Sequence, residues 1–385
     1  MSANRHISAT LSFASPRSTS MASEYLVRAA MSPKLPSNLK QLVSLLVNGT
    51  VMHEPGRFII ITKPFGISCV GYKQKNGGVF PESRFDRKGT SEEDHEEGVE
   101  NAQSQNLLSI EAALPFLAER FREPNLSFCT GLKRYVSGAV VLPASRSDFQ
   151  NILNSIRLCG IPEYGHHHRA LAICVGKPAK ECGEMSGYAT FERVRDHSEY
   201  TFVAGAKAKL RARTGKYAMA GAMEYRLLDS KYGCSLIDIS FSKFGRHLPR
   251  LMLTELLCPV LGDSMYMQRI IDVSGVPMLI SPSHLYRAKR HPVDMSLLLS
   301  RLNISRADVH NKFPLFLHVY RSVFPRYGCS KKSTDRVDLL AAAPLPPHML
   351  AMLECLGMSD AAARHLNAVA EEDSHEKRFS SESRF

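Results

Sequence analysis

The sequence has no long apolar run, no paired cysteine motif and few acidic residues near its N-terminus, and each absence excludes a class of protein. No stretch approaches the roughly eighteen consecutive apolar residues of a membrane-spanning helix, so we expect no membrane span. The nine cysteines are odd in number and include no C-x-x-C pair, which argues against a disulfide framework and a zinc ribbon. We therefore expect free thiols in a reducing compartment.

The first fifty residues contain one acid, Glu24, and are rich in Ser and Ala. Their basic residues are Arg5, Arg17, Arg28, Lys34 and Lys40. This composition is typical of a mitochondrial transit peptide, and the apolar core of a secretory signal is missing. We expect residues 1–48 to be a transit peptide and N-terminal extension, with an early helix near Leu39–Leu46, and the protein to lie in the mitochondrial matrix. A disordered basic tail is the alternative.

The net charge of +12 is unevenly distributed along the chain. Residues 82–100 carry eight acidic and three basic residues, so the rest is more basic, as expected for a partner with a phosphate backbone. Residues 73–105 have no apolar pattern and predict a disordered acidic insertion. The sequence therefore predicts one domain over 49–358, interrupted by this insertion, and a polar tail over 359–385.

Helical and strand patterns surround the segment Leu126–Leu142, which has the layout of an active-site loop running into a buried strand. Apolar residues recur at helical spacing in Leu107–Phe121, and a second helix is expected through Ile156 with Ser145 or Ser147 as its N-cap. Ala170–Gly176 is a short apolar run that predicts a strand ending in a turn. These elements place Leu126–Leu142 between two helices.

Six segments, in order, resemble the signatures of RluA-type pseudouridine synthases. Leu126–Leu142 is similar to the family's H-R-L-D-x-x-T-S-G-L-L-L-L motif, and the others are similar to K-P-x-G, S-L-V-E-V, T-G-R-T-H-Q-I-R, P-I-L-G-D-x-x-Y and A-P-L-P. In that order, the segments that match these five motifs are Phe58–Gly66, Ser235–Phe241, Phe244–Arg250, Pro259–Asp263 followed by Tyr266, and Ala343–Pro347. The match spans roughly residues 55 to 358, and Cys258–Asp263 resembles the family's animal mitochondrial branch.

The resemblance implies an α+β fold: the pseudouridine synthase fold, with a mixed, mainly antiparallel central sheet, flanking helices and an RNA-binding cleft. It also implies isomerisation of uridine to pseudouridine, which in this family depends on one aspartate and needs no metal or organic cofactor.

Two positions of the catalytic pattern depart from the family. Lys133 stands where the family has its aspartate, and Ala170 stands where it has a tyrosine that stacks on the target base. A protonated ammonium has three donors and no acceptor lone pair, so it cannot accept a proton. No Asp or Glu lies between Glu123 and Asp148, and we expect Asp148 to have a structural role at the start of the following helix.

Arg250 matches the family arginine that pairs with the aspartate. The candidate catalytic positions are therefore Lys133, expected to be inactive, and Arg250, which without its carboxylate partner is free to bind a phosphate. Tyr164 is a candidate replacement for the stacking tyrosine. We assign His247 no catalytic role.

Basic residues near the motifs are candidate RNA contacts. They are Lys63, Arg134 and a stripe of alternating cations formed by Lys207, Lys209, Arg211, Arg213 and Lys216. Alternation places the stripe on one face of an extended segment, where it can follow a phosphate backbone. A solvated strand that discourages edge pairing is the alternative. A second basic cluster is Arg287, Lys289, Arg290 and His291.

The run His166–His168 suggests a metal site, but consecutive residues point in different directions, so we predict a solvated loop and no metal.

The sequence thus predicts a mitochondrial RNA-binding protein of the pseudouridine synthase family with isomerisation lost or weak. Its partners would be structured mitochondrial RNA, ribosomal or messenger, and components of mitochondrial ribosome assembly. An active synthase and a protein-binding scaffold are the alternatives.

Overall fold

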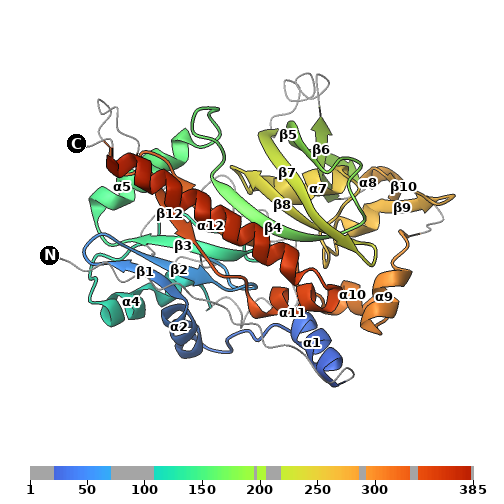
Figure 1. Cartoon of the computed structure of the whole chain (residues 1–385), viewed down its shortest axis with the longest axis horizontal. Helices are drawn as coiled ribbons and strands as arrows, with labels where there is room; N and C mark the ends of the chain where they lie inside the picture. Colours follow the sequence, from blue (N-terminus) through green and yellow to red (C-terminus); the bar gives the residue numbers. More distant parts are fainter. Residues whose placement is uncertain are drawn as a thin grey trace.

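The computed structural model describes residues 21–70, 108–194, 197–204, 218–285, 292–329 and 337–382. Within these ranges, ten strands form one sheet in the order β1-β2-β3-β11-β4-β8-β7-β5-β6, with β12 paired to β11 (Figure 1). The strands are β1 (Thr50–Glu54), β2 (Phe58–Lys63), β3 (Ser137–Pro143), β4 (His168–Val175), β5 (Cys182–Val194), β6 (His197–Ala204), β7 (Met219–Lys231), β8 (Cys234–Phe241), β11 (Leu317–Phe324) and β12 (Leu339–Ala342). β3 and β11 are parallel, and the other pairs in this sheet are antiparallel. A hairpin of β9 (Ile270–Val273) and β10 (Val276–Leu279) forms a separate two-stranded sheet.

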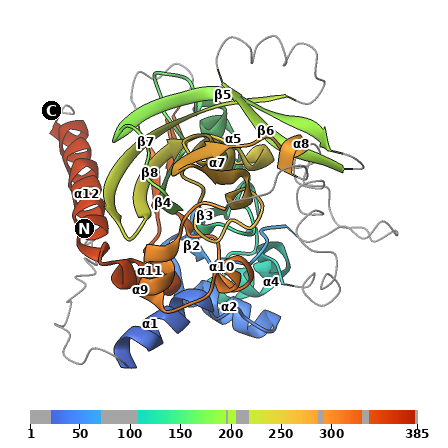
Figure 2. The ribbon, with the colours of Figure 1, turned by 90° about the vertical axis from the view of Figure 1, so that its right-hand side faces the viewer.

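Helices cover both faces of the sheet. One face packs against α2 (Leu39–Asn48), α4 (Ile110–Phe121) and α7 (Leu248–Glu255). The other face packs against α5 (Arg146–Leu158), α9 (Ser296–Leu302), α11 (Pro347–Leu356) and α12 (Ser359–Glu382), with α1 (Met21–Met31) against α11. Two short helices, α8 (Pro282–Leu285) and α10 (Arg306–Lys312), complete the set in the described ranges. Figure 2 shows α12 on one side of β7 and β8 and α7 on the other.

Local sequence explains the central elements. β3 is an apolar run buried along its whole length, and β8 is buried at every position but one, because helices cover both faces of the sheet. Ser109 and Ser145 cap α4 and α5 by accepting hydrogen bonds from the backbone N–H groups of Ala112 and Asp148. The α+β class, the mixed and mainly antiparallel sheet, and the helices expected in Leu39–Leu46, Leu107–Phe121 and after Ser145 are confirmed.

The two ends of the described chain differ from the expectation of an extension and a tail. Leu42 and Leu46 of α2 are fully buried in the main core, and Val27 and Ala30 of α1 are buried against the other face. Residues 359–382, predicted as part of a polar tail, form α12, in which Ala361, Ala362 and Val369 are buried. The fold therefore uses segments on both sides of the predicted 49–358 domain. The acidic insertion at 73–105 lies outside the described residues.

The three histidines at 166–168 also differ from the expected solvated loop. His167 and His168 are buried, and His166 is half-buried. Each Nδ1 has a different partner: the Ser242 hydroxyl for His166, the Val323 carbonyl oxygen for His167 and the Ser322 hydroxyl for His168. The prediction of a solvated loop is wrong because the run enters β4, which packs between β11 and β8. No group of three or more His, Cys, Asp or Glu in the described ranges is arranged to hold a metal ion.

No helix among the described residues is both long enough and apolar enough to cross a membrane. All nine cysteines lie in those residues and are free thiols.

Candidate functional site

Lys63 fixes the loop that carries Lys133. Its side chain is fully buried, and its ammonium donates hydrogen bonds to the carbonyl oxygens of Pro64, Arg134 and Val136 at 3.0, 3.3 and 2.6 Å. Three carbonyl acceptors satisfy the three ammonium donors, which allows a charged group to be buried. Lys63 has no exposed surface from which to contact RNA, so its prediction as an RNA contact is wrong. It joins the end of β2 to the turn before β3.

Further bonds hold the same loop. The backbone N–H of Gly66 donates to the Arg134 carbonyl oxygen at 2.9 Å, and Arg134 Nε donates to the Gly66 carbonyl oxygen at 3.2 Å. The thiol of Cys69 donates to the Leu132 carbonyl oxygen at 3.2 Å. Lys133 lies between these anchored residues and is half-buried. Arg134 is also half-buried, and its predicted contact with RNA stays a prediction.

The Ser-Gly pair that follows the loop is explained by strand packing. A Cβ atom on Gly138 would lie 2.3 Å from the carbonyl oxygen of Val319, because β3 and β11 approach closely as parallel neighbours. The Ser137 hydroxyl is buried at 2.9 Å from Nδ1 of His318 on β11. These two motif residues therefore position the loop relative to the sheet.

Arg250 of α7 is buried beside this loop and is bound by a carboxylate. Its Nε and one terminal nitrogen each donate to Asp263 at 2.8 Å, a bidentate ion pair in which both side chains are almost fully buried. The guanidinium carbon also lies 4.5 Å from the ring centroid of Tyr135 and 5.0 Å from that of Tyr266. The prediction that Arg250 is free to bind a phosphate is therefore wrong, because Asp263 binds its guanidinium.

We call the group formed by Tyr135, His247, Arg250, Asp263 and Tyr266 the Arg250 cluster. The Tyr266 hydroxyl and Nδ1 of His247 are 2.9 Å apart, and the rings of Tyr135 and His247 meet edge to face at 5.7 Å. Arg246 and His247 both have a positive φ of about 55°, a costly conformation for side chains of this size. This tight turn carries the chain from β8 into α7 and directs His247 into the cluster.

Positive charges surround His247. Burial lowers the pKa of His247 well below its ordinary value, and the charges of Arg250, Lys133 and Arg269 lower it further. His247 is therefore neutral at pH 7, and the charge of Lys133 acts directly on this group. Burial raises the pKa of Tyr266 well above its ordinary value, so its hydroxyl stays protonated and can donate to the neutral imidazole.

Two carboxylates in and beside the cluster, Asp263 and Glu199, are bound to arginines. Asp263 binds Arg250 and also accepts hydrogen bonds from the backbone N–H groups of Met265 and Tyr266 at 3.1 and 3.0 Å. Glu199 of β6 accepts a hydrogen bond from Arg269 at 2.8 Å. Neither has the freedom of an acid–base group.

Asp148, the next acid after the loop, belongs to a different part of the molecule. It accepts hydrogen bonds from the Tyr327 and Ser145 hydroxyls at 2.6 Å each, consistent with the structural role expected of it.

The remaining predicted residues lie apart from this group or outside the described chain. Ala170 is fully buried in β4 on the sheet face that packs the cluster, and Tyr164 lies in the turn before that strand. The stripe of Lys207, Lys209, Arg211, Arg213 and Lys216 and the cluster at 287–291 lie outside the described residues. Sequence reasoning missed Tyr135, Asp263 and Tyr266 as neighbours of Arg250. The sequence marked Asp263 and Tyr266 only as members of a family motif. It could not show that they contact Arg250, because that contact forms only in the tertiary structure.

Comparisons with known proteins extend these findings. No family model matches the chain. The chain is similar to the human mitochondrial mRNA pseudouridine synthase RPUSD3, with 28% identity over 257 residues, which are 65% of this chain and 69% of that protein. Its similarity to mouse mitochondrial mRNA pseudouridine synthase Rpusd3 is 30% over 136 residues, 35% of this chain and 37% of that protein.

Among solved structures, the fold is similar to that of human RNA pseudouridylate synthase domain containing 4. The TM-score is 0.50 at 17% sequence identity, and the match covers 83% of this chain and 96% of that chain. At this identity the likeness establishes the fold alone. The fold predicted from the motifs is confirmed, as is their resemblance to the RluA-type family and its animal mitochondrial branch.

Proposed function

Because this chain is related to the RluA-type pseudouridine synthases of animal mitochondria, we propose that it binds mitochondrial RNA and isomerises uridine weakly or not at all. The single observation that carries the proposal is Lys133. It occupies the family's aspartate position, on a loop that Lys63 anchors, and its positive charge acts on the Arg250 cluster. The protein would hold RNA in a cleft inherited from a synthase.

The chemistry of the cluster supports this proposal. Uridine isomerisation in the family requires a carboxylate at the flipped nucleotide, whereas a protonated lysine offers only donors. Asp263 cannot replace that carboxylate, since Arg250 and two backbone N–H groups already bind its oxygens. Lys133 adds a positive charge beside this cluster, and RNA has one phosphate for each nucleotide to which such a charge can bind.

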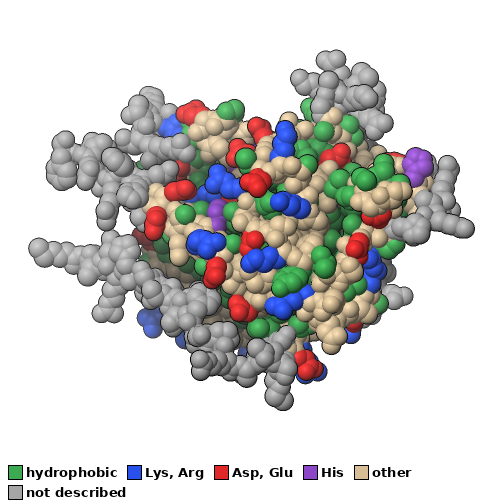
Figure 3. Space-filling view, turned by 45° about the vertical axis from the view of Figure 1, so that its right-hand side comes forward, with side chains coloured by type: hydrophobic (Ala, Val, Ile, Leu, Met, Phe, Trp, Pro, Cys, Tyr) green, Lys and Arg blue, Asp and Glu red, His purple; other side chains and the backbone are tan. Residues whose placement is uncertain are grey.

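The distribution of surface charge limits where the RNA could bind. The net charge is +12, but the face shown in Figure 3 mixes Lys and Arg with Asp, Glu and apolar side chains. No part of the described surface on this face is uniformly basic, so we expect phosphate contacts elsewhere. The stripe at 207–216 remains the predicted contact. The RNA would be a structured ribosomal or messenger RNA of the mitochondrial matrix, and the protein would act in its folding or with components of ribosome assembly.

One experiment tests the proposal directly. The purified full chain would be incubated with mitochondrial RNA, and pseudouridines would be mapped against a sample without protein. RNA affinity would be measured in parallel at several salt concentrations. Lys133→Asp would restore the family's carboxylate. Lys133→Asn is the matched control, because asparagine has the shape of aspartate but no charge.

We expect salt-dependent RNA binding by all three proteins and no new pseudouridine from the wild type or Lys133→Asn. If Lys133→Asp makes pseudouridine and the other two proteins do not, the missing carboxylate is the reason that the wild type lacks activity. A discrete pseudouridine made by the wild type would contradict the loss of catalysis. It would favour the second candidate, an active synthase, which the name of the human relative supports. Absence of RNA binding would contradict the proposal as a whole and favour a scaffold bound by proteins.

A further inference from the structure

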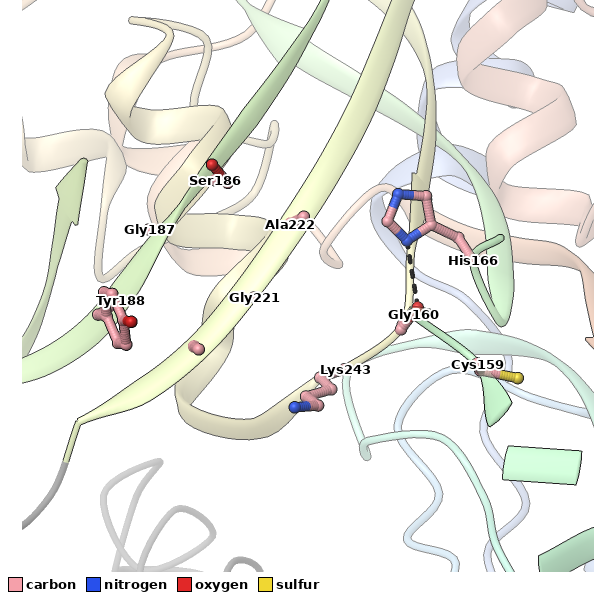
Figure 4. Close-up of a pocket in the computed structure, with 11 residues that line it drawn as sticks. Cys159, Gly160, His166, Ser186, Gly187, Tyr188, Gly221, Ala222 and Lys243 are labelled. Carbon is pink, nitrogen blue, oxygen red and sulfur yellow. Dashed lines mark hydrogen bonds between the residues drawn. The ribbon is translucent and has the colours of Figure 1, made fainter. Parts of the chain in front are cut away.

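A pocket of about 620 Å³ lies between the β5–β7 pair, the end of α5 and the residues after β8. Its volume is within the range of small-ligand sites, about 300–1,000 Å³. The lining comprises Cys159, Gly160, His166, Ser186, Gly187, Tyr188, Ala220, Gly221, Ala222, Ser242 and Lys243 (Figure 4). None of these residues belongs to the Arg250 cluster.

The pocket lies on the sheet face opposite to α7 and the Arg250 cluster. Ala189 and Met223 point into the core that α7 covers, and a Cβ on Gly221 would meet Leu248 of α7 at 1.9 Å. Because side chains alternate along a strand, Tyr188 and Ala222 point the other way, into the pocket. A ligand there would be separated by the sheet from anything bound at Lys133.

The floor of the pocket is flat and built from small residues. Gly187 pairs with Gly221, and on either side Ser186 pairs with Ala222 and Tyr188 with Ala220. Packing on the far face explains the glycines, since a Cβ on either would collide with neighbours there. Ser186 and Ala220 are exposed, so packing within the chain does not require them to be small. The result is an open platform of backbone and small side chains that can accept a planar ring.

Polar groups surround this platform on two sides. Figure 4 shows Tyr188 on one side of the strand that carries Gly221 and Lys243 on the other, with the Lys243 ammonium pointing back toward that strand. On the same side as Lys243, Nδ1 of His166 lies 3.1 Å from the Ser242 hydroxyl. Hydroxyls and a neutral imidazole both donate and accept, as the edge of a nucleobase requires, and an ammonium binds phosphate as a point charge.

We propose that this pocket binds one nucleotide of single-stranded RNA, with its base on the Ser186–Ala222 platform and its phosphate at Lys243. The inference rests on the proposed function, because it assumes that the protein binds RNA. It adds a second contact site, on the other face of the sheet, and it selects unpaired over double-helical RNA, since a base must be unstacked to lie on the platform.

The test combines affinity with photochemical crosslinking on the full chain. The probe is a short single-stranded oligouridylate carrying one 4-thiouridine, and a double-stranded RNA of equal length is the comparison. Ser186→Leu fills the platform at an exposed position, and Lys243→Glu reverses the charge at the phosphate. The matched controls are Ala179→Leu and Lys180→Glu, which introduce the same two residues at exposed positions in the turn after β4. Unchanged thermal unfolding would show that each variant is folded.

We expect crosslinks in peptides that contain Tyr188 or His166, and their loss in Ser186→Leu. Affinity for the single strand should fall about tenfold in Ser186→Leu. For Lys243→Glu the slope of log affinity against log salt should become shallower by roughly 0.7. Both controls should bind as the wild type does. Wild-type binding with crosslinks elsewhere, and variants of unchanged affinity, would overturn the pocket assignment alone. No binding of either RNA by the wild type would overturn the proposed function and this inference with it.

Discussion

Lys63 is a buried lysine whose ammonium is bonded to three backbone carbonyl oxygens of the loop around Lys133. Lys63→Met keeps most of the volume but leaves the three oxygens without this donor. We expect the free energy of unfolding to fall by about 3 kcal/mol, the cost of buried acceptors that lose a charged donor. Urea unfolding would measure it, with Lys34→Met, at an exposed position, as the control. A loss no larger than that of the control would show that Lys63 does not anchor the loop.

The Arg250–Asp263 pair gives a second test at the level of single residues. Asp263 accepts hydrogen bonds from two backbone N–H groups in addition to its bidentate pair with Arg250. Asp263→Leu removes the carboxylate from a buried arginine and leaves two backbone N–H groups without their acceptor, and we expect it to cost about 3–5 kcal/mol of stability.

Arg250→Met should cost less than Asp263→Leu, because the Asp263 carboxylate keeps its backbone donors. The double variant should be more stable than the sum of the two single losses predicts. A double-mutant cycle by urea unfolding would measure the difference, and simple additivity would contradict the coupling.

At the scale of elements, α12 is fastened to the sheet by a buried polar network centred on Asp238 of β8. Asp238 binds Arg169 at 3.0 Å, the Tyr320 hydroxyl at 2.9 Å and Nε2 of His365 on α12 at 3.2 Å. Burial alone would raise the pKa of Asp238, but His365 and Arg169 outweigh it and hold the pKa below its ordinary value. The network therefore stabilises the packed helix while Asp238 is charged.

The two polar contacts of α12 should differ in strength. His365→Ala removes a buried bond to a carboxylate, and we expect a loss of about 1.5–3 kcal/mol. Glu372→Gln removes only a 3.8 Å contact between Arg169 and a side chain that is 68% exposed, and we expect less than about 0.5 kcal/mol. Hydrogen exchange of the α12 amides would compare them. Equal protection in both variants would mean that apolar contacts alone hold the helix.

The same elements show what the sequence can predict. β3 and the Ala170–Val175 part of β4 are apolar runs and β8 alternates apolar and polar residues, so these strands were predictable, as was the cap at Ser145. The burial of α12 could not be predicted, because its few buried residues are mostly alanines within a charged segment. Lys63 looks like any surface lysine until its three carbonyl partners are brought together by the fold. The partner of Arg250 is Asp263, thirteen residues later in the sequence and beyond the end of α7, so the pair is recognised only in the tertiary structure.

At the scale of the whole molecule, several histidines are buried in their neutral form. Burial lowers the pKa of His167 and His348 to about 4 and that of His318 to about 3, and it holds those of His168 and His247 well below the ordinary value. The unfolded chain takes up protons near pH 6.5, where these folded histidines do not. The unfolded state therefore binds more protons at lower pH, so stability should be complete above about pH 6.5 and fall toward pH 4.

His348 allows this acid sensitivity to be assigned to one group. Its ring lies 5.7 Å from that of Phe65 and 5.8 Å from that of Phe316, an apolar setting that a phenylalanine would suit. His348→Phe removes one group that must gain a proton on unfolding, so the stability lost between pH 7 and pH 5 should shrink by about 2 kcal/mol. Urea unfolding across this range would measure it, with His284→Phe, at an exposed position, as the control. Parallel profiles for His348→Phe and wild type would show that the charge on His348 is accommodated in the folded protein, and the acid sensitivity would then belong to the other buried histidines.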